Sequence, residues 1–215
     1  MRENFQTELA NLKNSVAEMA SNARALLTQT VDAWRVNDLT GLKAIASQVS
    51  GLYLRERQIE HHALSLLLRE QPVARDLVDV SIALKTVSDW GRIGVQVCDV
   101  AAILARAANC VSENEQALLI KMAEALDPML SNAKALLLEE TSVDPRSLYQ
   151  LDDVVDDLFR EIRDAALERE QKTDTMPRVV LDVVLLAKYL ERIGDHACNI
   201  AEWTLFARSG FTTPT

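Results

Sequence analysis

The sequence predicts an all-α protein made of two tandem three-helix bundles, with six long antiparallel helices and pseudo-two-fold repeat symmetry. Apolar residues recur at spacings of three and four along almost the whole chain, and alternating apolar and polar runs are absent. The 215 residues include only 6 Gly and 5 Pro, so that long helices are seldom interrupted. Two segments 100 residues apart also resemble each other, which indicates an internal repeat.

Helix ends are expected where the periodic pattern stops. Asp38 suits an N-cap position, and Pro72 suits the first turn of a helix better than its interior. Ser112 followed by Glu115 matches a capping box. The predicted helices span residues 4–36, 38–70, 73–109, 113–140, 146–171 and 176–208. Because short connections join long helices, neighbouring helices should be antiparallel and form bundles.

The internal repeat is clearest in the third and sixth predicted helices. Residues 91–101 read GRIGVQVCDVA, and residues 191–201 read ERIGDHACNIA. Arg, Ile, Gly, Cys and Ala coincide. The shared glycines, Gly94 and Gly194, lie in mid-helix, where glycine costs roughly 1 kcal/mol relative to alanine. We therefore expect both glycines to allow a close approach between helices.

The repeat also predicts two domains of similar size. Upstream of the two matching segments, RERQIE at residues 55–60 parallels LDDVVD at residues 151–156. Two copies of a three-helix unit account for the length of the chain. We expect the first repeat to span residues 1–110 and the second to span residues 111–215.

Composition excludes several classes of protein. The formal net charge of -9 argues against binding to nucleic acid and against adsorption to anionic lipid. The three cysteines are odd in number and form no CxxC pair, so neither a disulfide framework nor a zinc finger is indicated. The N-terminus lacks the apolar segment of a signal peptide, and the stretch VVLDVVLLAKYL is too short to span a bilayer. We expect a cytoplasmic protein without membrane insertion.

Paired carboxylates in the second repeat form a candidate metal site. Glu191 and Asp195 are four residues apart and share one helix face, as do Asp152 and Asp156 on the preceding helix. Like charges at this spacing repel, and a cation held between the two helices would compensate, because hard metal ions prefer oxygen ligands. Asn199 continues the same face and could add a carbonyl oxygen. Two alternatives are a solvated acidic face with nearby basic partners and a docking surface for a basic patch.

The first repeat has fewer acidic residues at the matching positions. Glu56 and Glu60 correspond to the acids of the fifth helix, but Gly91 and Val95 stand where the sixth helix has Glu191 and Asp195. Asp99 matches the asparagine position. We expect this second site to be weak or empty.

Several classes of enzyme site are missing from the sequence. A di-iron enzyme of ferritin type needs Glu-x-x-His motifs, and this sequence contains none. It also has no Gly-rich phosphate loop, and its Ser, Cys and His residues are too scattered to suggest a nucleophile with its base. A non-enzymatic protein is therefore predicted.

The sequence resembles the PhoU family over nearly its whole length. ERIGDHACNIAE at residues 191–202 and QPVARDL at residues 71–77 are similar to two family signatures, and MRENFQTELANLKNSVAEM is similar to the family's opening. The resemblance implies two tandem three-helix bundles and a negative regulator of the bacterial phosphate response. It implies a cytoplasmic adaptor between the ATPase subunit of a phosphate ABC transporter and a sensor histidine kinase.

The resemblance also carries expectations about metal and oligomeric state. Some PhoU proteins bind iron or other metals, and many are dimers. The family motif falls on Asp152, Asp156, Glu191 and Asp195, which become the expected ligands of iron or another divalent cation. Gly91 and Val95 depart from the family pattern, which has an acidic residue at each of these two positions. This departure leaves open a divergent paralogue with a different transporter partner. Further alternatives are a metal-dependent oxidase and a purely structural assembly unit.

Overall fold

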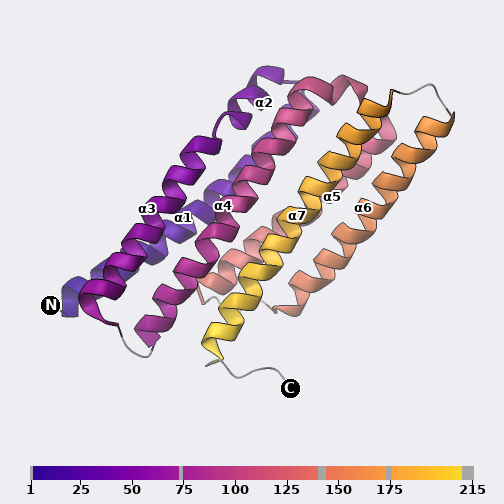
Figure 1. Ribbon diagram of the computed structural model, residues 1–215. Coiled ribbons are helices and arrows are strands. Elements are labelled where there is room, and N and C mark those ends of the chain that lie inside the picture. Colours follow the sequence, from indigo (N-terminus) through magenta and orange to yellow (C-terminus); the bar gives the residue numbers. More distant parts are fainter. Residues whose placement is uncertain (1, 73–74, 140–143, 173–175, 210–215) are drawn as a thin grey trace.

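The computed structural model describes residues 2–72, 75–139, 144–172 and 176–209, and nearly all of them are helical (Figure 1). The helices, in chain order, are α1 (Arg2–Arg35), α2 (Leu39–Ala46), α3 (Val49–Glu70), α4 (Arg75–Ala107), the short 3-10 helix η1 (Ala108–Cys110), α5 (Glu113–Leu137), α6 (Arg146–Lys172) and α7 (Pro177–Arg208).

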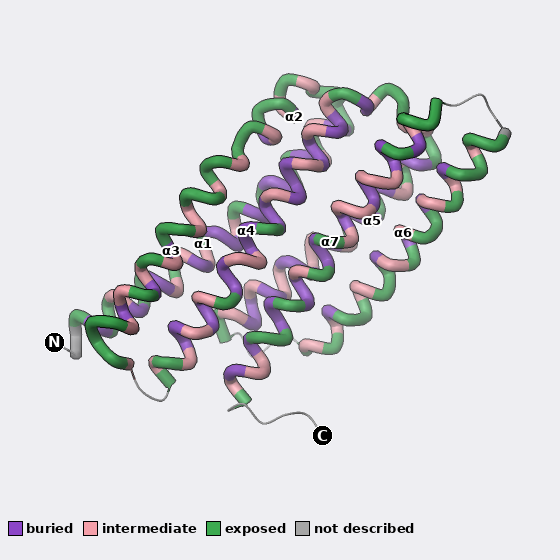
Figure 2. Tube along the Cα trace, viewed as in Figure 1, coloured by how far each residue is buried: buried purple, intermediate pink, exposed green. Residues whose placement is uncertain are grey.

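The predicted fold class is confirmed. In Figure 1, α1, α3 and α4 run beside one another as the first bundle, and α5, α6 and α7 form the second. The two bundles meet mainly where α4 packs against α7, and α1 also contacts α5. Buried side chains line the centre along α4 and α7, whereas α3 and α6 lie at the edges and are exposed along their outer sides (Figure 2).

The predicted helix 38–70 is divided by a turn at Ser47 and Gln48 into α2 and α3. The Ser47 hydroxyl donates to the carbonyl oxygen of Ala44 at 2.7 Å, and the Gln48 N–H donates to the carbonyl of Ile45 at 3.0 Å. The backbone bond of Gln48 spans three residues, as in a 3-10 turn, and the Ser47 side chain adds a second bond across the same turn. Neither glycine nor proline occupies the turn, so no local signal in the sequence indicates it.

Two predicted caps are confirmed. The Asp38 side chain accepts a hydrogen bond from the Gly41 N–H at the start of α2. Ser112 and Glu115 form a reciprocal capping box at the start of α5. Pro72 precedes α4, whose described part begins at Arg75. These caps satisfy amide groups that the first helical turn leaves without partners.

Within the described residues, one helix is long and apolar enough to cross a membrane, namely Arg75–Cys110. Its most apolar window is 56% buried inside the protein. Trp90, Ile93 and Val97 on this helix are each 0% exposed. The helix therefore has the character of a core helix shared by the two bundles.

Candidate functional sites

Three of the four predicted metal ligands come together between α6 and α7. Burial raises the pKa of Asp152, and the negative charges of Asp156 and Asp195 raise it further. A hydrogen bond with Cys198 acts in the opposite direction. Burial and the charge of Asp152 together raise the pKa of the Cys198 thiol. This thiol is therefore protonated at neutral pH and can donate to the carboxylate.

The fourth predicted ligand has a different partner. Glu191 forms an ion pair with Lys188, one turn earlier on α7, and the Glu191 side chain is only 14% exposed. The Lys188 Nζ atom also lies 5.4 Å from the centroid of the Phe159 ring on α6. Asn199, the proposed amide ligand, is exposed on α7. The acidic face is thus partly neutralised by the chain's own basic residues.

As placed, these side chains do not build a metal centre. Within the parts of the chain that the structure describes, no group of three or more His, Cys, Asp or Glu residues could hold a metal ion. The charges of Asp156 and Asp195 raise the pKa of Asp152, but Glu191 is engaged by Lys188. The metal ligand set predicted from the sequence remains a prediction.

The first repeat fills the equivalent space differently. A Cβ atom on Gly91 would lie 2.6 Å from Oε2 of Glu56, so the missing side chain makes room for this carboxylate. Burial raises the pKa of Glu56, and the charge of Glu60 adds to the effect. Burial also raises the pKa of Asp99. The three weaker predicted ligands are therefore partly shielded from water.

Contacts at the two shared glycines show which residues of α3 are equivalent to which residues of α6. A Cβ on Gly94 would meet Leu52 Cδ1 at 2.9 Å, and a Cβ on Gly194 would meet Asp152 Oδ1 at 3.1 Å. Both glycines allow a close approach, as predicted. Because they are equivalent, Leu52 corresponds to Asp152 and Glu56 to Asp156. The sequence comparison had paired Glu56 with Asp152, one helical turn away, since a shift of four residues preserves the helix face.

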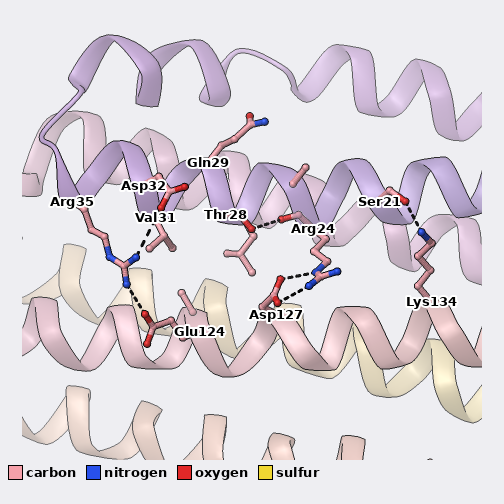
Figure 3. Close-up of a pocket in the computed structure, with 13 residues that line it drawn as sticks. Ser21, Arg24, Thr28, Gln29, Val31, Asp32, Arg35, Glu124, Asp127 and Lys134 are labelled. Carbon is pink, nitrogen blue, oxygen red and sulfur yellow. Dashed lines mark hydrogen bonds and ion pairs between the residues drawn. The ribbon is translucent and has the colours of Figure 1, made fainter. Parts of the chain in front are cut away.

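A hollow of about 700 Å³ lies between α1 and α5, where the two repeats meet (Figure 3). No motif in the sequence indicates this hollow, because its two walls are about a hundred residues apart in the chain. Small and aliphatic side chains line it together with polar and charged ones. The lining residues are Ser21, Arg24, Ala25, Leu27, Thr28, Gln29, Val31, Asp32, Arg35, Ala123, Glu124, Asp127 and Lys134.

Three polar contacts cross this α1–α5 hollow. Arg24 donates two hydrogen bonds to Asp127, at 2.6 and 2.7 Å, from Nε and from an Nη atom. Arg35 pairs with Glu124, and Lys134 Nζ donates to the Ser21 hydroxyl at 2.8 Å (Figure 3).

The charges that line the hollow balance. Arg24, Arg35 and Lys134 face Asp32, Glu124 and Asp127. The hydrogen bonds from Arg24 lower the pKa of Asp127, and the same contact raises the pKa of Arg24. The contacts across the hollow join the two repeats.

The opposite side of the repeat junction, between α4 and α7, also carries contacts that the sequence did not reveal. His196 Nδ1 lies 2.9 Å from Asp89 Oδ1, and the Lys85 ammonium lies 4.5 Å from the centroid of a Trp203 ring. The neighbour of His196 in sequence, Asp195, instead faces α6. Two adjacent residues of α7 therefore contact different helices: Asp195 lies toward α6 within the second repeat, and His196 contacts α4 of the first repeat.

Comparisons with known proteins agree with this architecture. A family model described as the PhoU domain matches the chain twice, at residues 16–104 and 119–204. The phosphate-specific transport system accessory protein PhoU homolog 1 of Thermotoga maritima is 26% identical over 214 residues, which cover 96% of this chain and 89% of the relative. The PhoU homolog of Deinococcus radiodurans is 29% identical over 210 residues, which cover 94% and 95% of the two chains.

A solved structure supports the fold independently. The phosphate transport system regulatory protein PhoU from Streptococcus pneumoniae superimposes with a TM-score of 0.80 at 20% sequence identity. The match covers 98% of this chain and 100% of that one.

Proposed function

Because this chain belongs to the PhoU family, we propose that it regulates phosphate uptake and phosphate-starvation signalling as a non-enzymatic adaptor. In this proposal it joins the ATPase subunit of a phosphate ABC transporter to a sensor histidine kinase, in the cytoplasm, and keeps the pair silent when phosphate is plentiful. The protein acts as a homodimer of two-repeat chains, with the repeat boundary at residues 110 and 111.

The observation that carries this proposal is the end-to-end match to accessory proteins of phosphate transport. The relatives from Thermotoga and Deinococcus both align over at least 94% of this chain. The described residues also offer large helical surfaces, which suit binding to other proteins.

A deletion strain tests the proposed regulation. A reporter of phosphate-starvation genes is measured in high phosphate in the wild-type host, in the deletion strain and in the strain complemented with this chain. The proposal predicts high reporter expression in the deletion strain and restored repression on complementation. Normal repression in the deletion strain would contradict the regulatory role.

A second candidate function is metal binding at Asp152, Asp156, Asp195 and Glu191. The supporting observation is that neighbouring carboxylates and burial raise the pKa of Asp152. A divalent cation such as iron would relieve this repulsion, if Glu191 exchanged Lys188 for the metal. The test is the metal content of purified protein after incubation with Fe²⁺, Mn²⁺, Zn²⁺, Ca²⁺ or Mg²⁺ and desalting. Binding that is lost in Asp195→Ala supports the site, and metal-free protein argues against it.

A further inference from the structure

A pocket of about 310 Å³ opens between α4 and α7, near the end of α7. The two helices pack side by side in this part of the molecule (Figure 1). The volume falls within the range of about 300–1,000 Å³ that is typical of sites for small molecules. We call this the α4–α7 pocket. Its lining residues are Ser81, Ile82, Leu84 and Lys85 of α4 and Trp203 and Ala207 of α7.

The lining of the α4–α7 pocket is mostly apolar and carries a single charge, that of Lys85. The Lys85 ammonium lies over a ring of Trp203, 4.5 Å from its centroid. Among the described residues no carboxylate forms an ion pair with Lys85, although the chain has 32 acidic and 23 basic residues. The face of an aromatic ring attracts a cation but does not neutralise it. The ammonium can therefore still donate a hydrogen bond to a carboxylate that enters the pocket.

The acidic residue that follows Lys85 and the one that precedes Trp203 face elsewhere. Asp89, one helical turn after Lys85, lies 2.9 Å from a histidine nitrogen of α7. Glu202 lies toward α6, because burial raises the pKa of Tyr149 on α6 and the negative charge of Glu202 raises it further. Neither carboxylate is among the residues that line the pocket. The positive charge of Lys85 is thus left for a ligand.

The contact between Lys85 and Trp203 is held in place by a neighbouring ring and is not required by the repeat. Trp203 is 38% exposed, and its ring meets that of Phe206 edge to face, with centroids 5.7 Å apart. The internal repeat aligns Trp203 with Ile103, which is 4% exposed, and Lys85 with Leu185. The three-helix unit therefore accepts aliphatic residues at both positions. The exposed tryptophan beside a lysine indicates a role in binding rather than in folding.

We propose that the α4–α7 pocket binds a small organic carboxylate with an aromatic or aliphatic body. The body packs against Ile82, Leu84 and Trp203, and the carboxylate accepts a hydrogen bond from the Lys85 ammonium. A small acid suits this site better than an acidic segment of another protein, because the formal net charge of -9 repels a large anionic surface more strongly than a single carboxylate. The inference does not depend on the proposed adaptor role.

Fluorescence titration of the purified full chain tests the chemistry of the ligand. Trp34 is 7% exposed and Trp90 is 0% exposed, so a change in tryptophan emission reports mainly on Trp203. The probes are 3-phenylpropionate, the uncharged 3-phenylpropanamide and the cationic 3-phenylpropylamine, which share one apolar body, at constant ionic strength.

The carboxylate probe should give a saturable change in emission. The amide should bind about tenfold more weakly, because it lacks the charge that Lys85 recognises, and the amine should bind more weakly than the amide. No saturable change with the carboxylate would overturn the proposal. Equal binding of the amide would also overturn it, since the pocket would then be an apolar contact surface without preference for an acid.

Variants test whether the probe binds in this pocket. Lys85→Gln should abolish the preference for the carboxylate over the amide. Lys121→Gln is the matched control, because it removes an exposed lysine of α5 that does not line the pocket, and it should keep the preference. Ser81→Phe places a large side chain in the pocket and should remove binding of the carboxylate, and circular dichroism melts check that each variant is folded. A preference that survives Lys85→Gln, or binding unchanged by Ser81→Phe, would contradict the assignment.

Discussion

Oδ1 of Asp152 lies 3.1 Å from the position that a Cβ atom on Gly194 would occupy. In the first repeat, Gly94 faces Leu52 instead. The equivalent glycines of the two repeats thus face different side chains, an acidic one at Gly194 and an apolar one at Gly94. Because Leu52, Gly91 and Val95 stand where the second repeat has acids, the set of four paired acids is complete in the second repeat and incomplete in the first.

Alanine at Gly94 should destabilise the protein by about 1–3 kcal/mol, because the new Cβ would press on both methyl groups of the half-buried Leu52. Gly51→Ala is the matched control, since a Cβ there meets nothing within 4 Å. It should stabilise α3 by up to about 1 kcal/mol. Urea unfolding measures both changes. Equal effects of the two substitutions would show that Gly94 has no special packing role.

Asp152→Asn should stabilise the metal-free protein at pH 7. The pKa of Asp152 is raised by burial and by neighbouring carboxylates, so the folded state binds a proton more readily than the unfolded state. Wild-type stability therefore falls as pH rises through the raised pKa of this carboxyl. The advantage of the asparagine variant should disappear as pH falls below the ordinary aspartate range.

Urea unfolding at pH 7 and pH 4, in buffer with a chelator, measures this effect. Asp153→Asn is the control for loss of an exposed charge on the same turn; because Asp153 is the weakest of the charges that act on Asp152, its substitution should have a much smaller effect. A loss of stability in Asp152→Asn at pH 7 would mean that the charged carboxylate is stabilising, for example through a tightly retained cation.

The Arg24–Asp127 contact should contribute only about 0.5 kcal/mol of coupling energy, since both side chains are partly exposed, at 44% and 39%. A double-mutant cycle with Arg24→Ala and Asp127→Ala measures it by urea unfolding. The coupling should shrink further in 1 M salt, because salt screens exposed charges. A coupling of several kcal/mol that resists salt would show that this contact holds the repeats together more strongly than exposed ion pairs do.

Glu115→Ala should destabilise the protein by about 3 kcal/mol. The Glu115 side chain is 1% exposed, accepts a hydrogen bond from the Ser112 N–H and pairs with Arg169 of α6 at 3.0 Å. Its removal leaves the mostly buried Arg169 without this carboxylate. The exposed Glu113, in the same helical turn, is the control, and Glu113→Ala should change stability by less than about 0.5 kcal/mol. Chemical denaturation of the three proteins distinguishes the two positions.

Most of the fold could be predicted from the sequence, because helical periodicity and caps are local. Asp38 and Ser112 are N-caps at the start of α2 and α5, as the capping rules predict. The turn at Ser47 escaped prediction because the apolar periodicity continues across it. The register between the repeats was wrong by one turn, since four residues return a helix to the same face.

The sites were less predictable, because they depend on how distant helices pack. The four second-repeat acids were identified from their spacing, and the Lys188–Glu191 pair, three residues apart on one helix, agrees with the alternative of basic partners for the acidic face. The α1–α5 hollow and the contact between His196 and Asp89 join residues about a hundred positions apart. No motif within a single helix encodes such contacts.

An affinity purification of this chain from its native host, in high and in low phosphate, tests the adaptor role most directly. Mass spectrometry identifies the proteins that are retained, and an unrelated helical bundle protein serves as the bait control. The account predicts recovery of a phosphate-transporter ATPase or a sensor histidine kinase, with more recovered in high phosphate. Recovery of neither protein in either condition would contradict it.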